Sequence, residues 1–415
     1  MTSREVPAAE LVEPLEARAL CSAATAEFVI HVSVDGLRPD AITASPPSEL
    51  PNFHRLRVEG AFTDNARSDY DSTVTLPNHA AQVTGRPTFG CGRHVRGHRW
   101  TFNGDAPAGR TIHRKAGGYV ASAWDVAHDH GLRTALFATK TKFAMFDHSY
   151  DADARRRQGG AADVTGADNG RDKIDAFALG DSAVVTNGLV AAMAAEPFHY
   201  AMVHYRDPDE AGHGHGWMGG EYLEAVRAVD AQLGSILRTV DTTPALSGRT
   251  AIILTSDHGG SGHDHGAAGE RLHYTIPFYV WGPGVAAGAD LYALNPLNRL
   301  DPGGAAPDYA GTQPIRNGDA ANLALDFLDL PSVPNSFFNA DQRLVVTPGD
   351  VPTAPVTPPC PHRRRQRAGR PSPHARSLVL PKSDEMNKGT HLLSECVPLL
   401  QPQRSPLSIL APRGC

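Results

Sequence analysis

Short apolar runs that end in polar, glycine-rich turns alternate along the chain with longer amphipathic stretches. The apolar runs are rich in β-branched and aromatic residues and have the length of buried strands, which is about four to eight residues. We therefore predict strands within residues 27–37, 132–139, 198–205, 250–257 and 274–285.

The stretches between the apolar runs have the spacing of amphipathic helices. In the clearest of them, residues 221–240, the apolar positions that form a helical stripe are Leu223, Val226, Val229, Leu233, Ile236 and Leu237. We predict helices at 52–61, at 79–85 after a turn at Pro77, and at 182–195, 221–240 and 319–330. Strands that alternate with helices are typical of a mostly parallel sheet covered on both faces. The pattern therefore predicts an α/β fold of three layers.

The regular pattern begins near residue 27 and ends near Val346. Residues 1–26 are polar, alanine-rich and acidic, which predicts a flexible N-terminal arm. After Val346 the chain is rich in Pro and Arg and has no periodicity, which is the composition of a disordered segment. We expect one folded domain at 27–346 and a disordered tail at 347–415.

The composition is that of an ordinary globular protein, with 415 residues, 41% hydrophobic and 20% charged. A net charge of −6 argues against nucleic acid as the main partner. No apolar run approaches the roughly 20 residues of a membrane span. The acidic residues near the N-terminus argue against an export signal there. The 20 histidines cluster in glycine-rich stretches, which points to metal binding.

Three predicted strands end in acidic residues or lead directly into them. The first ends at Asp35, the strand in 198–205 leads into the segment DPDEAGHGHG, and the strand in 250–257 ends at Asp257 beside His258. In a parallel α/β sheet, ligands bind beyond the carboxyl ends of the strands. Because a helix cap explains one such Asp but not three accompanied by imidazoles, we predict a metal site at this edge.

The spacing of these residues suits zinc, which accepts carboxylate oxygen and neutral imidazole. Asp209 and His213 stand at positions i and i+4, so one helical turn can direct both at the same ion. Asp257 and His258 can reach one ion if the backbone turns, and the glycines that follow them permit that turn. His265, or its competitor His263, could supply one further ligand.

The segment DSTVTLPNHAAQVTGRP adds a candidate nucleophile, Thr75, at or near the N-terminus of a helix. There the hydroxyl faces free backbone N–H groups and the positive end of the helix dipole. A metal ion that lowers the pKa of this hydroxyl would make it a useful nucleophile.

In these segments the chain resembles the type I phosphodiesterase/nucleotide pyrophosphatase family of the alkaline phosphatase superfamily. The resemblance rests on VDGLRPD, TLPNHAAQVTGRP, DPDEAGHG, SDHG and YTIPFYVWGPGV, and it spans residues 27–346. It implies an alkaline-phosphatase-like fold and two zinc ions, with manganese or another divalent ion as an alternative. By position, one ion would be held by Asp209, His213 and His265. The other would be held by Asp35, Asp257 and His258, with Thr75 as a further metal ligand that bridges this ion and the substrate.

The implied activity is hydrolysis of small phosphoesters through a phosphothreonine at Thr75. Members of the family carry an asparagine that stabilises the oxyanion, and the corresponding stretch here offers His98 or Asn103. A phosphomonoesterase is an alternative, because the loop after Thr75 contains the extra cations that a monoester needs, namely Arg86, Arg93, Arg96 and Arg99. A catalytically inactive metal-binding homologue is a second alternative. Family members usually act in the periplasm or outside the cell.

Overall fold

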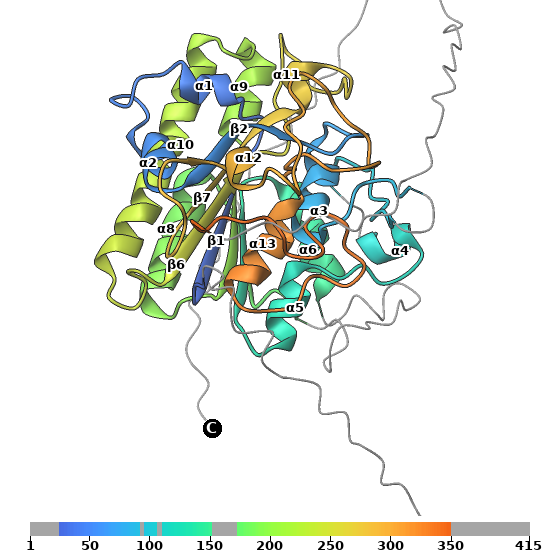
Figure 1. Cartoon of the computed structure of the whole chain (residues 1–415). Helices are drawn as coiled ribbons and strands as arrows, with labels where there is room; N and C mark the ends of the chain where they lie inside the picture. Colours follow the sequence, from blue (N-terminus) through green and yellow to red (C-terminus); the bar gives the residue numbers. More distant parts are fainter. Residues whose placement is uncertain (1–24, 92–94, 106–109, 152–171, 350–415) are drawn as a thin grey trace, which may run out of the picture. The chain divides into compact units, whose positions relative to one another are not determined.

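The computed structural model describes residues 25–91, 95–105, 110–151 and 172–349. All of them belong to one compact unit, residues 1–363, which is coloured along the chain in Figure 1. Nearly all of the predicted arm and tail lies outside the described residues, so both remain predictions. None of the described helices combines the length and the apolar composition that a membrane span requires.

A mixed sheet of eight strands forms the centre of this unit. The strands are β1 (Phe28–Val34), β2 (Ala61–Arg67), β3 (Thr134–Ala138), β4 (Ala176–Leu179), β5 (Tyr200–Tyr205), β6 (Thr250–Thr255), β7 (Thr275–Trp281) and β8 (Ala289–Asp290). Their order across the sheet is β4-β3-β5-β1-β6-β7-β2-β8. Strand β7 runs antiparallel to both of its neighbours, and the other adjacent pairs are parallel. The predicted mostly parallel sheet is confirmed.

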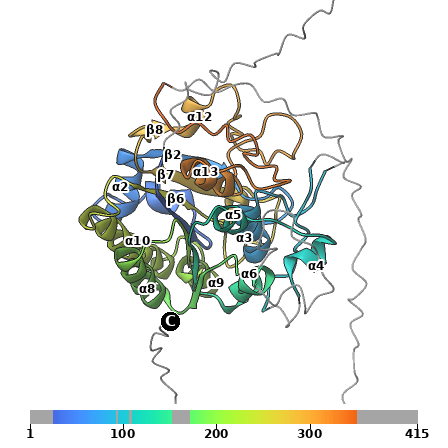
Figure 2. The same ribbon diagram turned by 90° about the horizontal axis from the view of Figure 1, so that it is seen from below.

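Helices cover both faces of the sheet (Figure 2). They are α1 (Pro39–Thr43), α2 (Pro51–Glu59), α3 (Thr75–Thr84), α4 (Ile112–Ala116), α5 (Ala123–Asp129), η2 (a 3-10 helix, Thr141–Phe143), α6 (Ala144–Tyr150), α8 (Ser182–Ala195), α9 (Asp207–His215), α10 (Gly220–Thr242), α11 (Arg271–Tyr274), α12 (Leu291–Leu294) and α13 (Asp319–Phe327). On one face α2, α8 and α10 pack on the sheet, and on the other face α3, α5 and α13 do so. The predicted three-layer α/β fold is confirmed.

Each face of the sheet has its own hydrophobic core, and strand β1 contributes to both. Its residues Ile30 and Val32 join the core beneath α10, whereas Val29 joins the core beneath α13. Side chains of a strand alternate between the two faces, so a central strand covered on both sides is mostly apolar. All residues of β1 are buried, and its two polar residues, His31 and Ser33, have hydrogen-bond partners in Tyr200 and His79, respectively.

The structure differs from the prediction near the sheet's edges and at Pro77. Strands β2, β4 and β8 were not predicted, because β2 is interrupted by a bulge between Thr63 and Ala66 and carries polar residues, whereas β4 and β8 have only 4 and 2 residues. Helix α3 begins at Thr75 and contains Pro77 in its first turn, so the predicted turn at Pro77 is wrong. Proline is accommodated there because the first N–H groups of a helix have no partner within the helix.

Candidate active site

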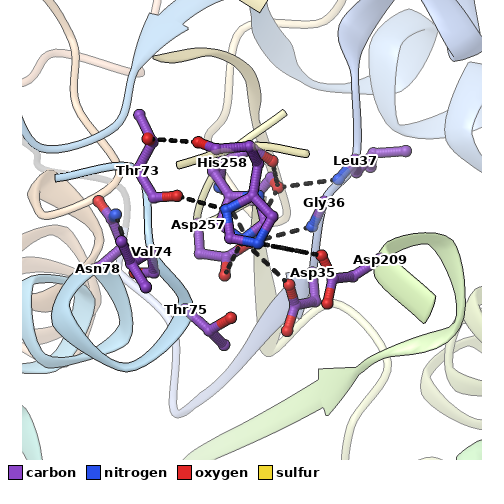
Figure 3. A network of polar contacts seen from close by, with 12 residues as sticks. Asp35, Gly36, Leu37, Thr73, Val74, Thr75, Asn78, Asp209, Asp257 and His258 are labelled. Atoms are coloured by element: carbon purple, nitrogen blue, oxygen red, sulfur yellow. Dashed lines mark hydrogen bonds and ion pairs between the residues drawn. The ribbon is translucent and has the colours of Figure 1, made fainter. Parts of the chain in front are cut away.

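The order of the strands brings the predicted rim residues together. Strands β5, β1 and β6 are adjacent and parallel, so their carboxyl ends meet at one edge of the sheet. Asp35 directly follows β1, Asp257 lies two residues after β6, and Asp209 lies in the first turn of α9, which follows β5. Residues 222 positions apart in the chain thereby become neighbours, as the close view in Figure 3 shows.

Six of the residues at this edge form two groups that could each hold a metal ion. Asp209, His213 and His265 form one group, and Asp35, Asp257 and His258 form the other. Within each group, one ligand atom of every residue lies within 4.8 Å of the others. The second group is completely buried, whereas the first is open to solvent at His213.

His258 has the protonation expected of a metal ligand. Its Nδ1 lies 2.8 Å from the carbonyl oxygen of Gly259, which can only accept, so Nδ1 carries the proton. Burial lowers the pKa of His258 well below its ordinary value, so Nε2 holds a lone pair. That lone pair is directed at Asp35 Oδ1, 3.4 Å away, and at Asp257 Oδ2, 3.2 Å away. Electron pairs that face each other in this way repel unless a cation lies between them.

The other two histidines follow the same rule. Nδ1 of His213 lies 2.9 Å from the carbonyl of His263, and Nδ1 of His265 lies 2.6 Å from the carbonyl of Thr73. The two Nε2 atoms lie 3.5 Å and 3.7 Å from Asp209 Oδ1, respectively. All three imidazoles therefore direct Nε2 at a carboxylate, with the other ring nitrogen fixed by a backbone carbonyl, as is usual for metal ligands.

His263, the competitor of His265, is outside both groups. Its Nδ1 lies 3.0 Å from the carbonyl of His213, and the Nδ1 of His213 in turn bonds to the carbonyl of His263. These reciprocal bonds tie the end of α9 to the loop that carries His265. The geometry thus gives His263 a role in holding the loop and places His265 beside Asp209.

Buried atoms without partners mark the same positions. Asp35 Oδ1, Asp209 Oδ1, Asp257 Oδ2 and His258 Nε2 have no hydrogen-bond partner within the described residues. Unsatisfied buried polar atoms are rare in native proteins and call for an explanation such as an ion. Each of the four belongs to one of the two groups, so the residues present fit a pair of divalent cations.

The charge of the site supports the same interpretation. Burial, together with the carboxylates of Asp35 and Asp209, raises the pKa of Asp257 well above its ordinary value. The cation nearest to these carboxylates is Lys140, whose Nζ lies 2.7 Å from Asp35 Oδ2 and 2.5 Å from Asp209 Oδ2. Lys140 thus pairs with two of the three carboxylates, and the remaining negative charge favours binding of further cations.

Thr75 is the first residue of α3, as predicted, and it is buried. Figure 3 shows it at the end of this helix, beside Asp35 and Asp257. The loop before it is fixed by Asn78, whose Nδ2 donates to the carbonyls of Ser72 (2.8 Å) and Val74 (3.2 Å). The hydroxyl therefore stands at the positive end of a helix whose entry is rigidly held.

The structure separates the two candidates for the oxyanion donor. Asn103 Oδ1 accepts from the backbone N–H of Leu76 at 2.9 Å, which places its amide at the N-terminus of α3 beside Thr75. His98 is fully buried, its Nδ1 accepts from Trp100 N–H at 3.0 Å, and burial together with Arg86 lowers its pKa to about 3. Asn103 thus caps the helix of the candidate nucleophile, whereas His98 lies inside the fold.

Two lysines that the sequence did not assign to the site lie within it. Lys140 joins the two carboxylates described above, and Lys142 Nζ lies 3.2 Å from Asn103 Oδ1. Both follow strand β3, whose carboxyl end lies at the same edge of the sheet as that of β1. Their position directly after a predicted strand was the signal in the sequence that could have identified them as site residues. The arginines proposed from the sequence as extra cations for a phosphomonoester include Arg86 and Arg93. Arg86 donates instead to the carbonyl of Pro334, and Arg93 lies outside the described residues.

Comparison with known proteins gives one match to a family model. The model described as type I phosphodiesterase / nucleotide pyrophosphatase matches residues 29–310, which is more than half of the chain. Among curated proteins, GPI ethanolamine phosphate transferase 1 of Mus musculus is 31% identical over 147 residues. These residues make up 35% of this chain and 16% of the transferase, so the chain spans only a small part of that protein.

Two solved structures have a similar fold. An inactive variant of murine ectonucleotide pyrophosphatase / phosphodiesterase 5, in complex with AMP, has a TM-score of 0.50 and 14% identity over 77% of this chain and 99% of that chain. The human protein of the same name has a TM-score of 0.50 and 13% identity over 76% of this chain and 99% of that chain. At such identities the likeness concerns the fold.

Proposed function

Because the chain belongs to the type I phosphodiesterase/nucleotide pyrophosphatase family, whose chemistry is the hydrolysis of phosphoester bonds, we propose that it is a two-metal phosphodiesterase acting through Thr75. One observation carries the proposal. His213, His258 and His265 each direct Nε2 at a carboxylate while a backbone carbonyl holds Nδ1, within two groups beside a threonine at a helix N-terminus. A structural core would instead bury apolar side chains at these positions.

The proposed reaction has two displacements at phosphorus. Thr75 Oγ loses its proton to solvent and forms a bond to phosphorus while the bond to the leaving-group oxygen breaks, which gives a phosphothreonine; the departing oxygen takes a proton from water. Water then cleaves the bond between phosphorus and Thr75 Oγ and regenerates the hydroxyl. When bound, the two cations, zinc or another divalent metal, would supply positive charge that lowers the pKa of the hydroxyl and stabilises the oxygens of the transferred group.

We assign Asp209, His213 and His265 to one cation, and Asp35, Asp257 and His258 to the other. The side-chain amide of Asn103, whose Oδ1 is held by the Leu76 N–H, would donate to a non-bridging phosphoryl oxygen. This gives the oxyanion role to Asn103 in place of His98, whose side chain is fully buried. Metal analysis of the purified protein, combined with turnover of bis-p-nitrophenyl phosphate, tests the proposal. Active protein without bound metal would reject it.

Replacement of Asn103 by alanine is expected to lower kcat for bis-p-nitrophenyl phosphate about 10²-fold or more, which is the usual effect of losing one oxyanion donor. The matched change is His98→Gln, which is expected to lower the melting temperature with a smaller effect on kcat. Steady-state kinetics and thermal melts of both variants provide the measurement. A normal kcat in Asn103→Ala with a large loss in His98→Gln would return the role to His98.

A phosphomonoesterase is a second candidate, and Lys142 is the observation that favours it. A phosphomonoester carries one more negative charge than a diester, so an enzyme directed at monoesters needs additional positive charge near the phosphoryl group. Lys142 approaches Asn103 at the N-terminus of α3, and burial together with Lys140 lowers the pKa of its ammonium group. A phosphoryl dianion would relieve this repulsion between the two lysines.

Lys142→Gln is expected to reduce kcat/KM for p-nitrophenyl phosphate at least about tenfold more than for bis-p-nitrophenyl phosphate, because a lost charge costs a dianion more than a monoanion. The change in the ratio of the two kcat/KM values is the measurement. Lys115→Gln, which removes an exposed lysine from α4, serves as the control. If Lys142→Gln lowers kcat/KM by the same factor for both substrates, the proposal of a phosphomonoesterase loses its support.

A further inference from the structure

His79 lies one helical turn after Thr75 on α3 and has no part in the reaction proposed above. Its side chain is completely buried between this helix and strand β1. Nδ1 lies 2.8 Å from the carbonyl oxygen of Thr75, and Nε2 lies 2.8 Å from the hydroxyl oxygen of Ser33. Both ring nitrogens are therefore engaged, one by the residue that carries the candidate nucleophile and the other by the central strand.

The direction of both hydrogen bonds follows from the partners. A carbonyl oxygen can only accept, so Nδ1–H donates to Thr75, and Nε2 must then accept from the hydroxyl of Ser33. Burial lowers the pKa of His79 well below its ordinary value, which is consistent with this neutral form. Asp257 Oδ2 is 3.6 Å from Nδ1, a longer distance than that of a hydrogen bond.

The ring has little freedom to turn. The rings of Phe143 and His204 pack against it edge to face, with centroid distances of 4.7 Å and 4.9 Å. Because Ser33 lies two residues before Asp35 on β1, a continuous path leads from the backbone of Thr75 through His79 to the strand that presents Asp35. An apolar side chain could fill the same space, but it could not make the two hydrogen bonds.

We propose that His79 is a positioning residue whose bond to the Thr75 carbonyl fixes the first turn of α3 and so holds the Thr75 hydroxyl at the Asp35, Asp257 and His258 group, while Ser33 on β1 orients the ring. The inference rests on the proposed function, since it concerns the placement of the proposed nucleophile. Displacement of a reacting group by about 1 Å can cost about 10² in rate, so a bond to the backbone of the nucleophile is expected to affect kcat.

Two substitutions separate the two bonds of His79. In His79→Asn the side-chain amide can occupy the place of Nδ1–H and donate to the Thr75 carbonyl, while contact with Ser33 is lost. In His79→Gln the longer amide reaches the place of Nε2 and Ser33, while the bond to Thr75 is lost. Ser33→Ala removes only the outer bond. The assay measures kcat and KM for bis-p-nitrophenyl phosphate, metal content and the melting temperature of each variant.

His79→Asn is expected to keep kcat within about tenfold of the wild type, and His79→Gln to lose about 10²-fold in kcat with KM little changed. Metal content should equal that of the wild type in both. Ser33→Ala should resemble His79→Asn. A wild-type kcat in His79→Gln overturns the inference. Equal losses of kcat in His79→Asn and His79→Gln would mean that His79 acts only through core packing. A loss of bound metal would mean that it acts by supporting the metal ligand Asp257. Either result also overturns the inference.

Failure of the proposed function has a different signature. If the wild type hydrolyses no phosphoester, or if Thr75→Ala keeps wild-type turnover, the proposed reaction itself is wrong whatever the His79 variants do. A variant that melts well below the wild type is compared at a lower temperature, where it is folded. There the ratio of kcat between His79→Asn and His79→Gln still decides the question, since both replace the imidazole by an amide.

Discussion

Replacement of Thr75 by alanine is expected to abolish multiple turnover of phosphodiesters, with kcat/KM reduced at least about 10³-fold and bound metal unchanged. Losing an enzyme's nucleophile costs about this much or more, because binding and electrostatic stabilisation alone remain. Metal content should persist because each group keeps its three carboxylate and imidazole ligands when Thr75 is replaced. The kinetics are to be measured together with elemental analysis of the same preparation.

A threonine on the same helix provides the control. Thr84, the last residue of α3, is equally buried, and its hydroxyl donates to the carbonyl of Ala80, away from the carboxylates. Thr84→Ala should therefore keep kcat while it loses some stability. Acid quenching of the wild type during turnover should trap on Thr75 a phosphoryl group that still carries the second ester substituent of the diester, detectable by mass spectrometry. Wild-type-like turnover by Thr75→Ala would reject the assignment of the nucleophile.

Asp257→Asn is expected to remove one of the two bound metal ions and to lower kcat/KM about 10³-fold, since a metal supplies several kcal/mol to the transition state. The substitution suits the site. Asp257 Oδ1 accepts from the N–H groups of Gly36 (3.1 Å) and His258 (2.9 Å), and asparagine can keep both bonds. Its NH₂ group would replace the unpartnered Oδ2, an atom proposed to bind the ion.

The stability of this variant should change in opposite directions with and without metal. In metal-stripped protein, Asp257→Asn should melt at or above the wild-type temperature, because it removes one of three crowded carboxylates. With metal present, the wild type should melt higher, because ions bound only by the folded state stabilise it.

Asp264→Asn is the control for this substitution, since Asp264 lies exposed on the neighbouring loop and likewise accepts from two N–H groups. Two equivalents of metal in Asp257→Asn, with normal activity, would contradict the assignment of Asp257.

Much of the candidate site could be predicted because strand ends are visible in the sequence. A buried central strand reads as a continuous apolar run, and in a parallel sheet the residue after each run lies at a common edge. Asp35 and Asp257 were found in this way. Asp209 and His213 required only the spacing of a helix, which α9 provides. Each of these predictions depends only on the local conformation of the backbone over a few residues.

Other parts of the site depend on contacts between distant segments. The position of Asn103 follows from its bond to the backbone of Leu76, 27 residues earlier in the chain. The position of Lys140 follows from two carboxylates that lie 105 and 69 residues away. No periodicity or motif spacing encodes such approaches, because they result from how loops fold back over the edge of the sheet.

The sequence by itself determined the layers of the fold, the strands that meet at the rim and the ligand types offered there, since these follow from local periodicity and strand length. Only the tertiary structure places His265, and not His263, beside Asp209, and Asn103, and not His98, at the backbone of Leu76. It also placed two lysines and His79 at the site. The physical reason is that local pattern specifies which face of an element is buried, whereas side-chain neighbours across loops are set by packing in three dimensions.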